Sequence, residues 1–311
     1  MKIKTFKTIS IVLAILVITT ISCKKEEEIT TPYNCTANMM ADQVAANTTT
    51  FTNFSGSPIQ GINGTTITIF DSFIDENGDE YTGIVNIELI EAQDNKNMLL
   101  MGYPTVTDIG ELLVSGGISF FYPTDNNGNP LYIDPNGTPP QVTIPNSTNN
   151  TNQMTLYTAS ENLDGEFVWV STGTTVTASN PPNSTFTFPI SSTGGVNMDY
   201  PLPPCTGNFT VNLPNGYNGS NSTVFLYFTN RNSVIRAYDN EDGNFVVNNM
   251  LCSLDSVQFV IISQIEGIRE YHVSDSFEIP GSWSYNVTSD DLEIRLCDEA
   301  LRLSIKDELI D

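Results

Sequence analysis

The chain has 311 residues and carries 36 acidic residues against 12 lysines and arginines, so its net charge at pH 7 is −24. Binding of nucleic acid requires lysines and arginines that neutralise phosphates, and this composition therefore excludes nucleic acid as a partner. Hydrophobic residues make up 39% of the chain, which supports folded cores and excludes a disordered protein. The abundance of Asn, Thr, Ser, Gly and Pro favours strands joined by turns over long helices.

The first 22 residues have the anatomy of a secretory signal. Three lysines, Lys2, Lys4 and Lys7, precede an almost wholly apolar run at residues 9–21. This run is shorter than the roughly 20 apolar residues that a membrane-spanning helix needs. We therefore predict that residues 1–22 are the cleaved signal peptide of an exported protein.

The segment Thr20-Ile21-Ser22-Cys23 resembles a bacterial lipobox, in which the signal is cut before a cysteine that receives lipid. Thr20 stands where the box usually has an aliphatic residue, and an ordinary cleaved signal with a chance cysteine is the alternative. The resemblance implies acylation of Cys23. Because a single acyl chain binds a bilayer only marginally, the two or three chains of a lipoprotein are needed to anchor it firmly.

The charged run at residues 24–28, Lys-Lys-Glu-Glu-Glu, follows Cys23 directly. It is similar to the acidic export signal that sends lipoproteins of the Bacteroidota to the cell surface. The resemblance implies an outer-membrane protein that is displayed on the cell surface. Anchorage in the inward-facing leaflet of the same membrane is the other location open to a lipoprotein. A solvated spacer behind the anchor is the alternative interpretation.

Polar residues then predict a flexible tether at 23–55, followed by a first β-sandwich domain at 56–172. Apolar and polar residues alternate at 66–69 and 85–89, as in half-buried strands, and Asn77-Gly78 between them is a strong hairpin signal. Residues 93–102 alone are typical of a short helix. Further strands are predicted at 112–122, 141–144, 154–158 and 167–170.

Residues 173–204 are expected to connect this domain to a second β-sandwich domain at 205–311, because the stretch begins with a run rich in Pro, Asn, Ser and Thr. Alternation in the tail from residue 291 onward favours strand over helix. The fold class is thus mostly β, with two antiparallel β-sandwiches of an Ig-like or jelly-roll-like kind. The strands of the second domain are predicted at 208–212, 224–229, 233–238, 244–248 and 256–263.

The run 73–131 resembles a module common in Bacteroidota lipoproteins of unassigned function. The residues that carry the resemblance are Gly78, Gly83, Glu91, Met98, Leu99, Gly102, Pro104, Thr105, Leu112, Leu113, Gly116 and Gly117. The module is distantly similar to the β-sandwich shared by netrin receptors and ankyrins, which implies an interaction unit and no catalytic residue. In the later segment 186–202, Gly195 stands where this family tends to have Trp.

Four cysteines remain beside Cys23, and in an exported chain an even number makes disulfides plausible, with three pairings to choose from. Cys205 and Cys252 flank the early strands of the second domain and are our first choice of pair, while free thiols are the alternative. No cysteine lies in a CxxC motif, which disfavours zinc. The four candidates are Cys35, Cys205, Cys252 and Cys297.

The sequence does not indicate an enzyme. His272 is the only histidine, and no nucleophile motif lies near it, which disfavours a catalytic triad. Two carboxylates are enough for a glycosidase, but sequence spacing cannot single out a pair among 36 acids. A carboxylate-based hydrolase is therefore the third hypothesis for the function.

Calcium is the one cofactor that the sequence suggests. Asp75, Asn77 and Asp79 alternate as loop ligands do, and hard oxygen ligands suit this ion. A second acidic cluster comprises Asp239, Glu241 and Asp242. Solvated turns are the alternative for both clusters.

Three further residues are candidates for binding or carrying sugars. Trp283 and Tyr285 share one face if they lie on a strand, and could form a stacking platform for a glycan, with simple packing as the alternative. Asp255-Ser256-Val257 resembles a short O-glycosylation motif of Bacteroidota exported proteins, which makes Ser256 a candidate acceptor.

The leading hypothesis is a non-catalytic, lipid-anchored outer-membrane protein that acts as a binding, structural or adhesion module. Its partners are the membrane, through the lipid, and either another envelope protein or a glycan. The alternative is an accessory lipoprotein that captures glycans for an outer-membrane importer.

Overall fold

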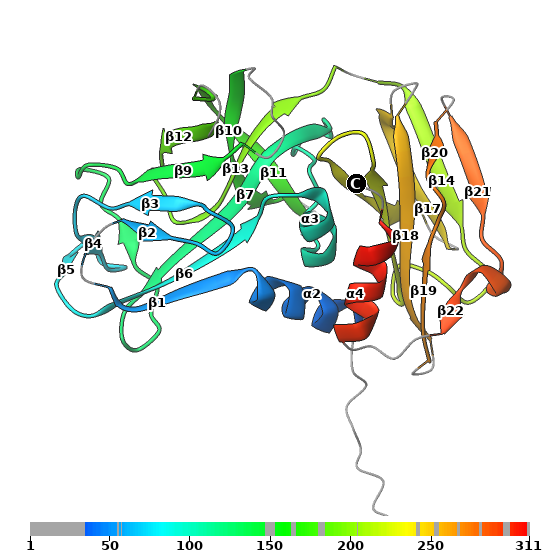
Figure 1. Ribbon diagram of the computed structural model, residues 1–311, viewed down its shortest axis with the longest axis horizontal. Coiled ribbons are helices and arrows are strands. Elements are labelled where there is room, and N and C mark those ends of the chain that lie inside the picture. Colours follow the sequence, from blue (N-terminus) through cyan, green and yellow to red (C-terminus); the bar gives the residue numbers. More distant parts are fainter. Residues whose placement is uncertain are drawn as a thin grey trace, which may run out of the picture. The chain divides into compact units, whose positions relative to one another are not determined.

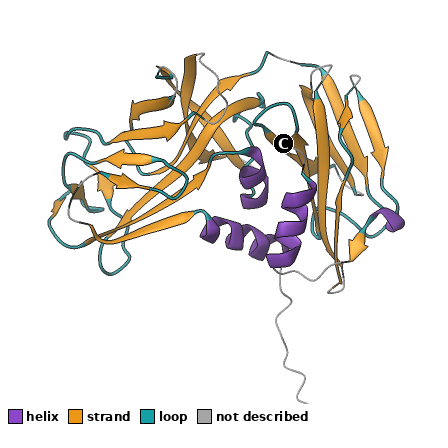
Figure 2. Cartoon of the chain, in the orientation of Figure 1, coloured by secondary structure: helices purple, strands orange, loops and turns teal. Residues whose placement is uncertain are grey.

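The computed structural model describes residues 35–309, except 55, 57, 147–152, 163–165, 180–183, 204, 241–242, 252–254, 266–267, 280–281 and 295–298. Residues 34–311 form one compact unit. The predicted signal peptide, Cys23 and the charged run lie outside the described residues. Figures 1 and 2 show that the described part is built mainly from strands, with a few short helices.

The first part of the fold is a β-sandwich, which confirms the predicted class. Its larger sheet has six antiparallel strands, and its smaller sheet has four. In spatial order the larger sheet comprises β1 (Thr48–Phe54), β6 (Val85–Ala92), β7 (Leu113–Thr124), β13 (Gly194–Pro201), β10 (Gln153–Glu161) and β11 (Phe167–Thr177). The smaller sheet comprises β12 (Thr185–Pro189), β9 (Gln141–Pro145), β3 (Thr66–Thr68) and β2 (Ile59–Gln60).

The core of this sandwich follows from alternation along the strands. In β9, Val142 and Ile144 are buried while their neighbours are only partly buried, so one face of the strand points inward. They pack in one cluster with side chains of the six-stranded sheet such as Leu89, Phe121 and Met198. A small third sheet, β5 (Glu80–Tyr81), β4 (Phe73–Ile74) and β8 (Tyr132–Ile133), adds Phe73 and Ile133 to the same cluster.

The second part is a nine-stranded sheet system with its own core. Its strands are β21 (Trp283–Asn286), β14 (Gly207–Asn212), β17 (Asn244–Leu251), β16 (Val234–Asp239), β15 (Ser222–Phe228), β18 (Ser256–Ile265), β19 (Ile268–Val273), β22 (Glu293–Ile294) and β20 (Phe277–Glu278). Every residue of β15 is buried, because the strand is covered on both faces. Val224, Leu226 and Phe228 enter the core of this part. Phe225 and Tyr227 point to the opposite side, toward the helices.

Three helices, α2 (Cys35–Ala46), α3 (Asn95–Met101) and α4 (Glu299–Glu308), share a hydrophobic cluster with both sheet systems (Figure 1). A 3₁₀ turn, Ser289–Asp291, lies before β22. Helix α3 confirms the prediction for residues 93–102 and has a defined start and end. The side chain of Asp94 accepts a hydrogen bond from the backbone N–H of Asn97, and Gly102 ends the helix at φ 76°, in the left-handed region that favours glycine.

The predicted tether and connection are wrong where the structure describes them. Residues 35–54, expected to be flexible, form α2 and β1, and β1 pairs with β6. Residues 173–204, expected to link two domains, contain the end of β11 and all of β12 and β13. Strand β13 pairs with β7 and β10 in the middle of the large sheet, so the polar composition of this stretch reflects exposed turns and strand faces.

The tail is also different from the prediction. Strand β22 lies where Leu292-Ile294-Leu296 alternates, but residues 299–308 form helix α4. Ile305 and Leu309 lie four residues apart and are both buried, which places them on one helical face. The sequence Leu301-Leu303-Ile305 therefore fits a strand by period two, whereas the packing selects the helical spacing.

The structure explains why a glutamate, Glu91, stands near the end of β6 in the module at 73–131. The Glu91 side chain is fully buried, and its carboxylate accepts backbone hydrogen bonds from Asn63 (2.9 Å) and Thr65 (2.8 Å). A Cβ on Gly61 would lie 2.0 Å from this carboxylate. Glu91 therefore fixes the loop between β2 and β3, and its role in this chain is structural.

Candidate functional site

An open cleft of about 460 Å³ lies where the β10–β11 hairpin faces β16. Glu161, Glu166 and Phe167 come from the hairpin, and Arg236, Tyr238 and Asp239 come from β16. These six residues define what we call the cleft. It brings together residues that are about 70 positions apart in the sequence, within the compact unit 34–311.

A short segment before β7 holds the two walls of the cleft in place. The Trp169 backbone N–H in β11 donates to Val106 (3.0 Å), and the Thr105 N–H donates to the carbonyl of Val234 at the start of β16 (2.8 Å). The indole N–H of Trp169 also donates to the Pro104 carbonyl (2.9 Å). Backbone hydrogen bonds on both sides of one segment therefore fix the separation of β11 and β16.

Glu166 and Tyr238 join the walls across the cleft. Burial raises the pKa of Tyr238, and the negative charge of Glu166 and a hydrogen bond to it raise that pKa further, while Arg236 lowers it. Glu166 is itself held by the Asn162 side chain, whose Nδ2 donates to Oε2 (2.9 Å). The Tyr238 phenol therefore stays protonated and acts as a hydrogen-bond donor at neutral pH.

Asp239 shapes the rim of the cleft. One of its carboxylate oxygens accepts from the backbone N–H of Gly219 (2.6 Å), and the other accepts from Gly243 (3.2 Å). Its partners in the second predicted calcium cluster, Glu241 and Asp242, lie outside the described residues. Both oxygens of Asp239 are thus engaged in closing loops.

Arg236 and Glu161 remain available to a ligand. Both side chains are exposed, and the guanidinium of Arg236 makes no ion pair with any residue that the structure describes. Glu161 lies on the opposite wall, next to Phe167, with which it pairs across the hairpin. The cleft therefore offers a cation and a carboxylate that can each form new hydrogen bonds.

The first predicted calcium cluster is a hairpin turn. Asp75 Oδ1 accepts from the backbone N–H groups of Asn77 (2.8 Å) and Asp79 (3.0 Å). These bonds, the one from Asp79 first, lower the pKa of Asp75. Asp125 and Asp134 begin turns of the same design, and among the described residues no three acidic, histidine or cysteine side chains are grouped to hold a metal ion. The geometry is that of the solvated turn, the alternative interpretation.

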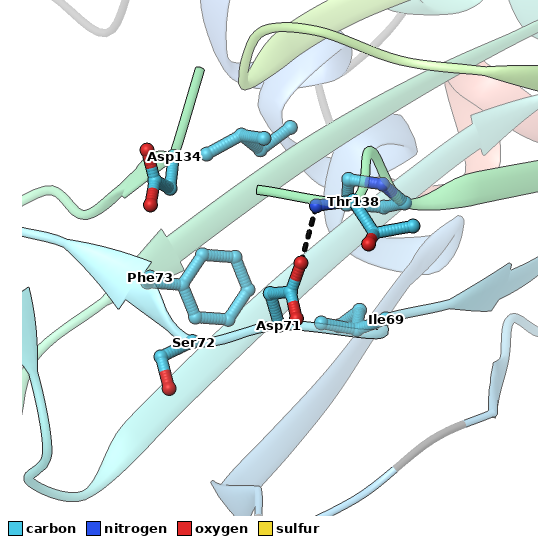
Figure 3. A pocket seen from close by; sticks show the side chains of 8 residues that line it. Ile69, Asp71, Ser72, Phe73, Asp134 and Thr138 are labelled. Carbon is cyan, nitrogen blue, oxygen red and sulfur yellow. Dashed lines mark hydrogen bonds between the residues drawn. The ribbon is translucent and has the colours of Figure 1, made fainter. Parts of the chain in front are cut away.

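A second, much smaller cavity beside the three-stranded sheet has room for about one water molecule, at about 10 Å³. Figure 3 shows the Asp71 carboxylate pointing at the backbone nitrogen of Thr138, which donates to it, with Phe73 beside it. This cavity is too small for an organic ligand.

Trp283 and Tyr285 share one face of β21, as predicted, and both are partly buried. Trp283 packs against Phe277 (ring centroids 4.3 Å apart) and Phe209 (5.7 Å), and Tyr285 packs against Phe259 (4.7 Å). The two rings thus close one side of the core of the second part, in agreement with the packing alternative.

The remaining candidates lie apart from the cleft. His272 on β19 contacts the Asp291 carbonyl through Nδ1 (2.8 Å). The hydroxyl of Ser256 is hydrogen-bonded to Thr229 (2.8 Å) and Ser276 (3.0 Å), and the neighbouring Asp255 is buried and paired with Arg231. Glycosylation of Ser256 would have to break both hydroxyl contacts.

Among the four cysteines, Cys205 is disulfide-bonded. Its partner is not among the side chains that the structure describes, since Cys252 and Cys297 lie outside the described residues and the side chain of Cys35 is not described. Gly207 pairs with Leu251, the residue before Cys252. This register supports the pairing of Cys205 with Cys252, which stays a prediction.

Sequence reasoning did not find the cleft. Arg236 and Tyr238 were part of a predicted strand at 233–238, and Glu161 and Glu166 were two of many acids. One feature of the sequence could have indicated the cleft. Arg236 is an arginine at an outward position of a strand in a strongly acidic chain, and such a residue is a candidate for ligand contact.

No helix in the described part of the chain is both long and apolar enough to cross a membrane. No protein-family model matches the sequence, and a search of curated proteins finds no match either.

Proposed function

We propose that the chain is a non-catalytic lipoprotein of the outer membrane, displayed on the cell surface, that binds a neutral glycan in the cleft between the β10–β11 hairpin and β16. The lipobox-like segment ending in Cys23 and the charged run behind it support the location. The observation that carries the binding role is the cleft, where Arg236, Glu161 and Tyr238 surround the half-buried ring of Phe167.

The size and shape of the cleft favour a small ligand over a protein partner. Ligand pockets typically enclose about 300–1,000 Å³, and the cleft lies within this range at about 460 Å³. A stable protein interface instead buries about 800 Å² on each partner over a broad surface. A concave site of this size accommodates one or two sugar rings.

The side chains of the cleft suit a polyhydroxylated ligand. The Arg236 guanidinium donates only, a carboxylate accepts only, and the Tyr238 phenol can do both. Sugar hydroxyls offer donors and acceptors to all three, while the ring of Phe167 can pack against an apolar sugar face. Because Glu161, Glu166 and Asp239 outnumber the one arginine, the cleft disfavours acidic sugars and phosphates.

The proposal is tested with the mature lipoprotein, kept in a zwitterionic detergent that carries no sugar, on an array of neutral and acidic oligosaccharides. We expect binding to neutral glycans, and Arg236→Ala should weaken it at least about tenfold, which is 1.4 kcal/mol. Lys306→Ala removes the same charge from helix α4, away from the cleft, and should have no effect.

Two results would contradict the proposal. One is the absence of binding to every neutral glycan on the array. The other is the release of new reducing ends from a bound oligosaccharide, because Glu161 and Glu166 would then act as the carboxylates of a hydrolase.

A further inference from the structure

We infer that the cleft is one end of a longer site, which continues over the six-stranded sheet along Phe167, Tyr103 and Tyr122 to Glu88 and takes an oligosaccharide of several sugar units. This inference rests on the proposed function, because it assumes that the cleft binds a glycan. It adds to the proposed function that the binding surface is extended and that the ligand is an oligosaccharide of several units.

The strand register places the members of this surface on one face of the sheet. Glu88 on β6 lies directly opposite Tyr122 on β7, and Glu161 on β10 lies directly opposite Phe167 on β11. The ring of Phe120, two residues before Tyr122 and on the same face, contacts Phe167 with ring centroids 6.2 Å apart. Both pairs therefore lie on the same face of the sheet, one on β6 and β7 and the other on β10 and β11.

Ring contacts connect the two ends. Tyr103, which follows helix α3, lies between them, with its ring centroid 4.5 Å from that of Phe120 and 5.2 Å from that of Phe167. Phe120 in turn stacks on Tyr122, with 6.1 Å between centroids and 16° between planes. Tyr122 is 41% exposed, Tyr103 and Phe167 are partly buried, and Phe120 is buried beneath them, so Tyr122, Tyr103 and Phe167 are the rings of this series with surface open to a ligand.

The charges around these rings support their proximity. Burial raises the pKa of Tyr103 to about 12, and the nearby Tyr122 and Glu88 add to this effect. Burial also raises the pKa of Tyr122, again with a contribution from Glu88. Both phenols therefore remain protonated donors beside the exposed carboxylate of Glu88, which accepts, and this mixture repeats the chemistry of the cleft.

Gly195 makes room for the Phe120 ring beneath the surface. It lies on β13, directly opposite Phe120 on β7, and a Cβ on this residue would lie 2.5 Å from the Phe120 ring. Because Gly195 has no side chain, the ring of Phe120 lies over the backbone of β13 and supports Tyr103 and Tyr122 from below. A larger residue at position 195 would push this ring out of the series.

The dimensions favour a chain of sugars over a single one. From Glu88 on β6 to Phe167 on β11 the path crosses β7, β13 and β10. Strands lie about 4.8 Å apart, so four spacings give a path of roughly 19 Å, several times the width of one sugar ring. The exposed ring of Tyr122, the partly buried rings of Tyr103 and Phe167, and the donors and acceptors beside them fit successive units of a neutral oligosaccharide.

The inference is tested by measuring affinity for cello-, xylo- and malto-oligosaccharides from monosaccharide to hexasaccharide, with the lipoprotein in the same detergent. We expect affinity to rise with chain length for at least one series. Tyr122→Ala should weaken hexasaccharide binding at least about fivefold and leave disaccharide binding unchanged, whereas Arg236→Ala should weaken both. Tyr122→Phe, which keeps the ring, should retain most of the affinity for the hexasaccharide.

Tyr132→Ala is the matched control, since Tyr132 is also 41% exposed but lies on the small sheet. Thermal melting of each variant checks that the fold is intact. If Tyr122→Ala has no more effect than Tyr132→Ala while Arg236→Ala still weakens binding, the extended surface is refuted and the cleft stands. If none of the three series binds, the extended surface is refuted as well, and the array of neutral glycans decides separately on the cleft.

Discussion

At the scale of single residues, the large sheet contains a carboxyl group that is completely enclosed. Asp199 on β13 has no exposed surface, and burial raises the pKa of its carboxyl well above the usual range. Asn197 Nδ2 donates to Asp199 Oδ2 (2.6 Å), and Ser115 Oγ donates to Asn197 Oδ1 (2.7 Å). A hydrogen bond donated to the carboxyl favours its ionised form, but burial has the larger effect and favours the neutral group.

The raised pKa makes the stability of the fold depend on pH. A group whose folded pKa lies above its unfolded pKa contributes stability that is present below the unfolded pKa and lost as pH rises through the folded pKa. Asp199→Asn stays neutral at every pH. Relative to this variant, the native chain should therefore lose about 1.4 kcal/mol for each pH unit between the two pKa values.

Urea unfolding from pH 4 to pH 8 measures this effect. The exposed Asp108→Asn is the control, and it should follow the native chain at every pH. Parallel stability profiles for the native chain and Asp199→Asn would mean that Asp199 has the same pKa in the folded and the unfolded state, which would contradict a raised pKa.

At the scale of elements, the turn between β15 and β16 connects the two sheet systems. Asn232 Nδ2 donates to the carbonyls of Ser115 (2.8 Å) and Gln93 (3.2 Å), and Ser233 Oγ donates to Leu113 (2.6 Å). The turn thus binds β7 and Gln93, and β7 is hydrogen-bonded to the segment 104–107 that positions β11, since the Leu113 N–H donates to the Thr105 carbonyl (2.9 Å). The turn therefore adds to the contacts that set the separation of the cleft walls.

Asn232→Ala should destabilise the protein by about 1–3 kcal/mol, because it leaves buried carbonyl groups without donors. It should also weaken glycan binding, since β16 would lose one of the contacts that attach it to the six-stranded sheet. Asn126→Ala, in an exposed turn, is the control. Equal denaturation midpoints for the two variants would mean that the turn does not join the sheet systems energetically.

The elements themselves were largely predictable from the sequence. Strands such as β9, whose burial alternates, and the capped helix α3 express local patterns that need no knowledge of distant residues. The tail was not predictable in this way, because Leu301-Leu303-Ile305 satisfies two periodicities and only packing selects between them. The polar composition of residues 173–204 predicts a connection, although β13 lies at the centre of the large sheet.

At the scale of the whole molecule, the candidate site arises from contacts that no local pattern encodes. Glu166 and Tyr238 meet only because residues 104–107 hold β11 and β16 on either side of them. The predicted platform at Trp283 and Tyr285 was a correct prediction of a shared strand face, but the face packs on the core. Whether an aromatic ring on a strand is exposed or buried depends on what the rest of the fold packs against that strand, and this holds for Tyr122 as well as for Trp283 and Tyr285.

The central claim is that the chain displays a glycan-binding cleft on the outer face of the cell. The most direct test is the capture of a fluorescent neutral oligosaccharide by intact cells that express the full chain. We predict fluorescence on cells with the native chain and little on cells with Arg236→Ala or Cys23→Ala, because one variant lacks the ligand contact and the other lacks the anchor. Equal fluorescence on cells with the native chain and with Arg236→Ala, at equal protein levels, would contradict the claim.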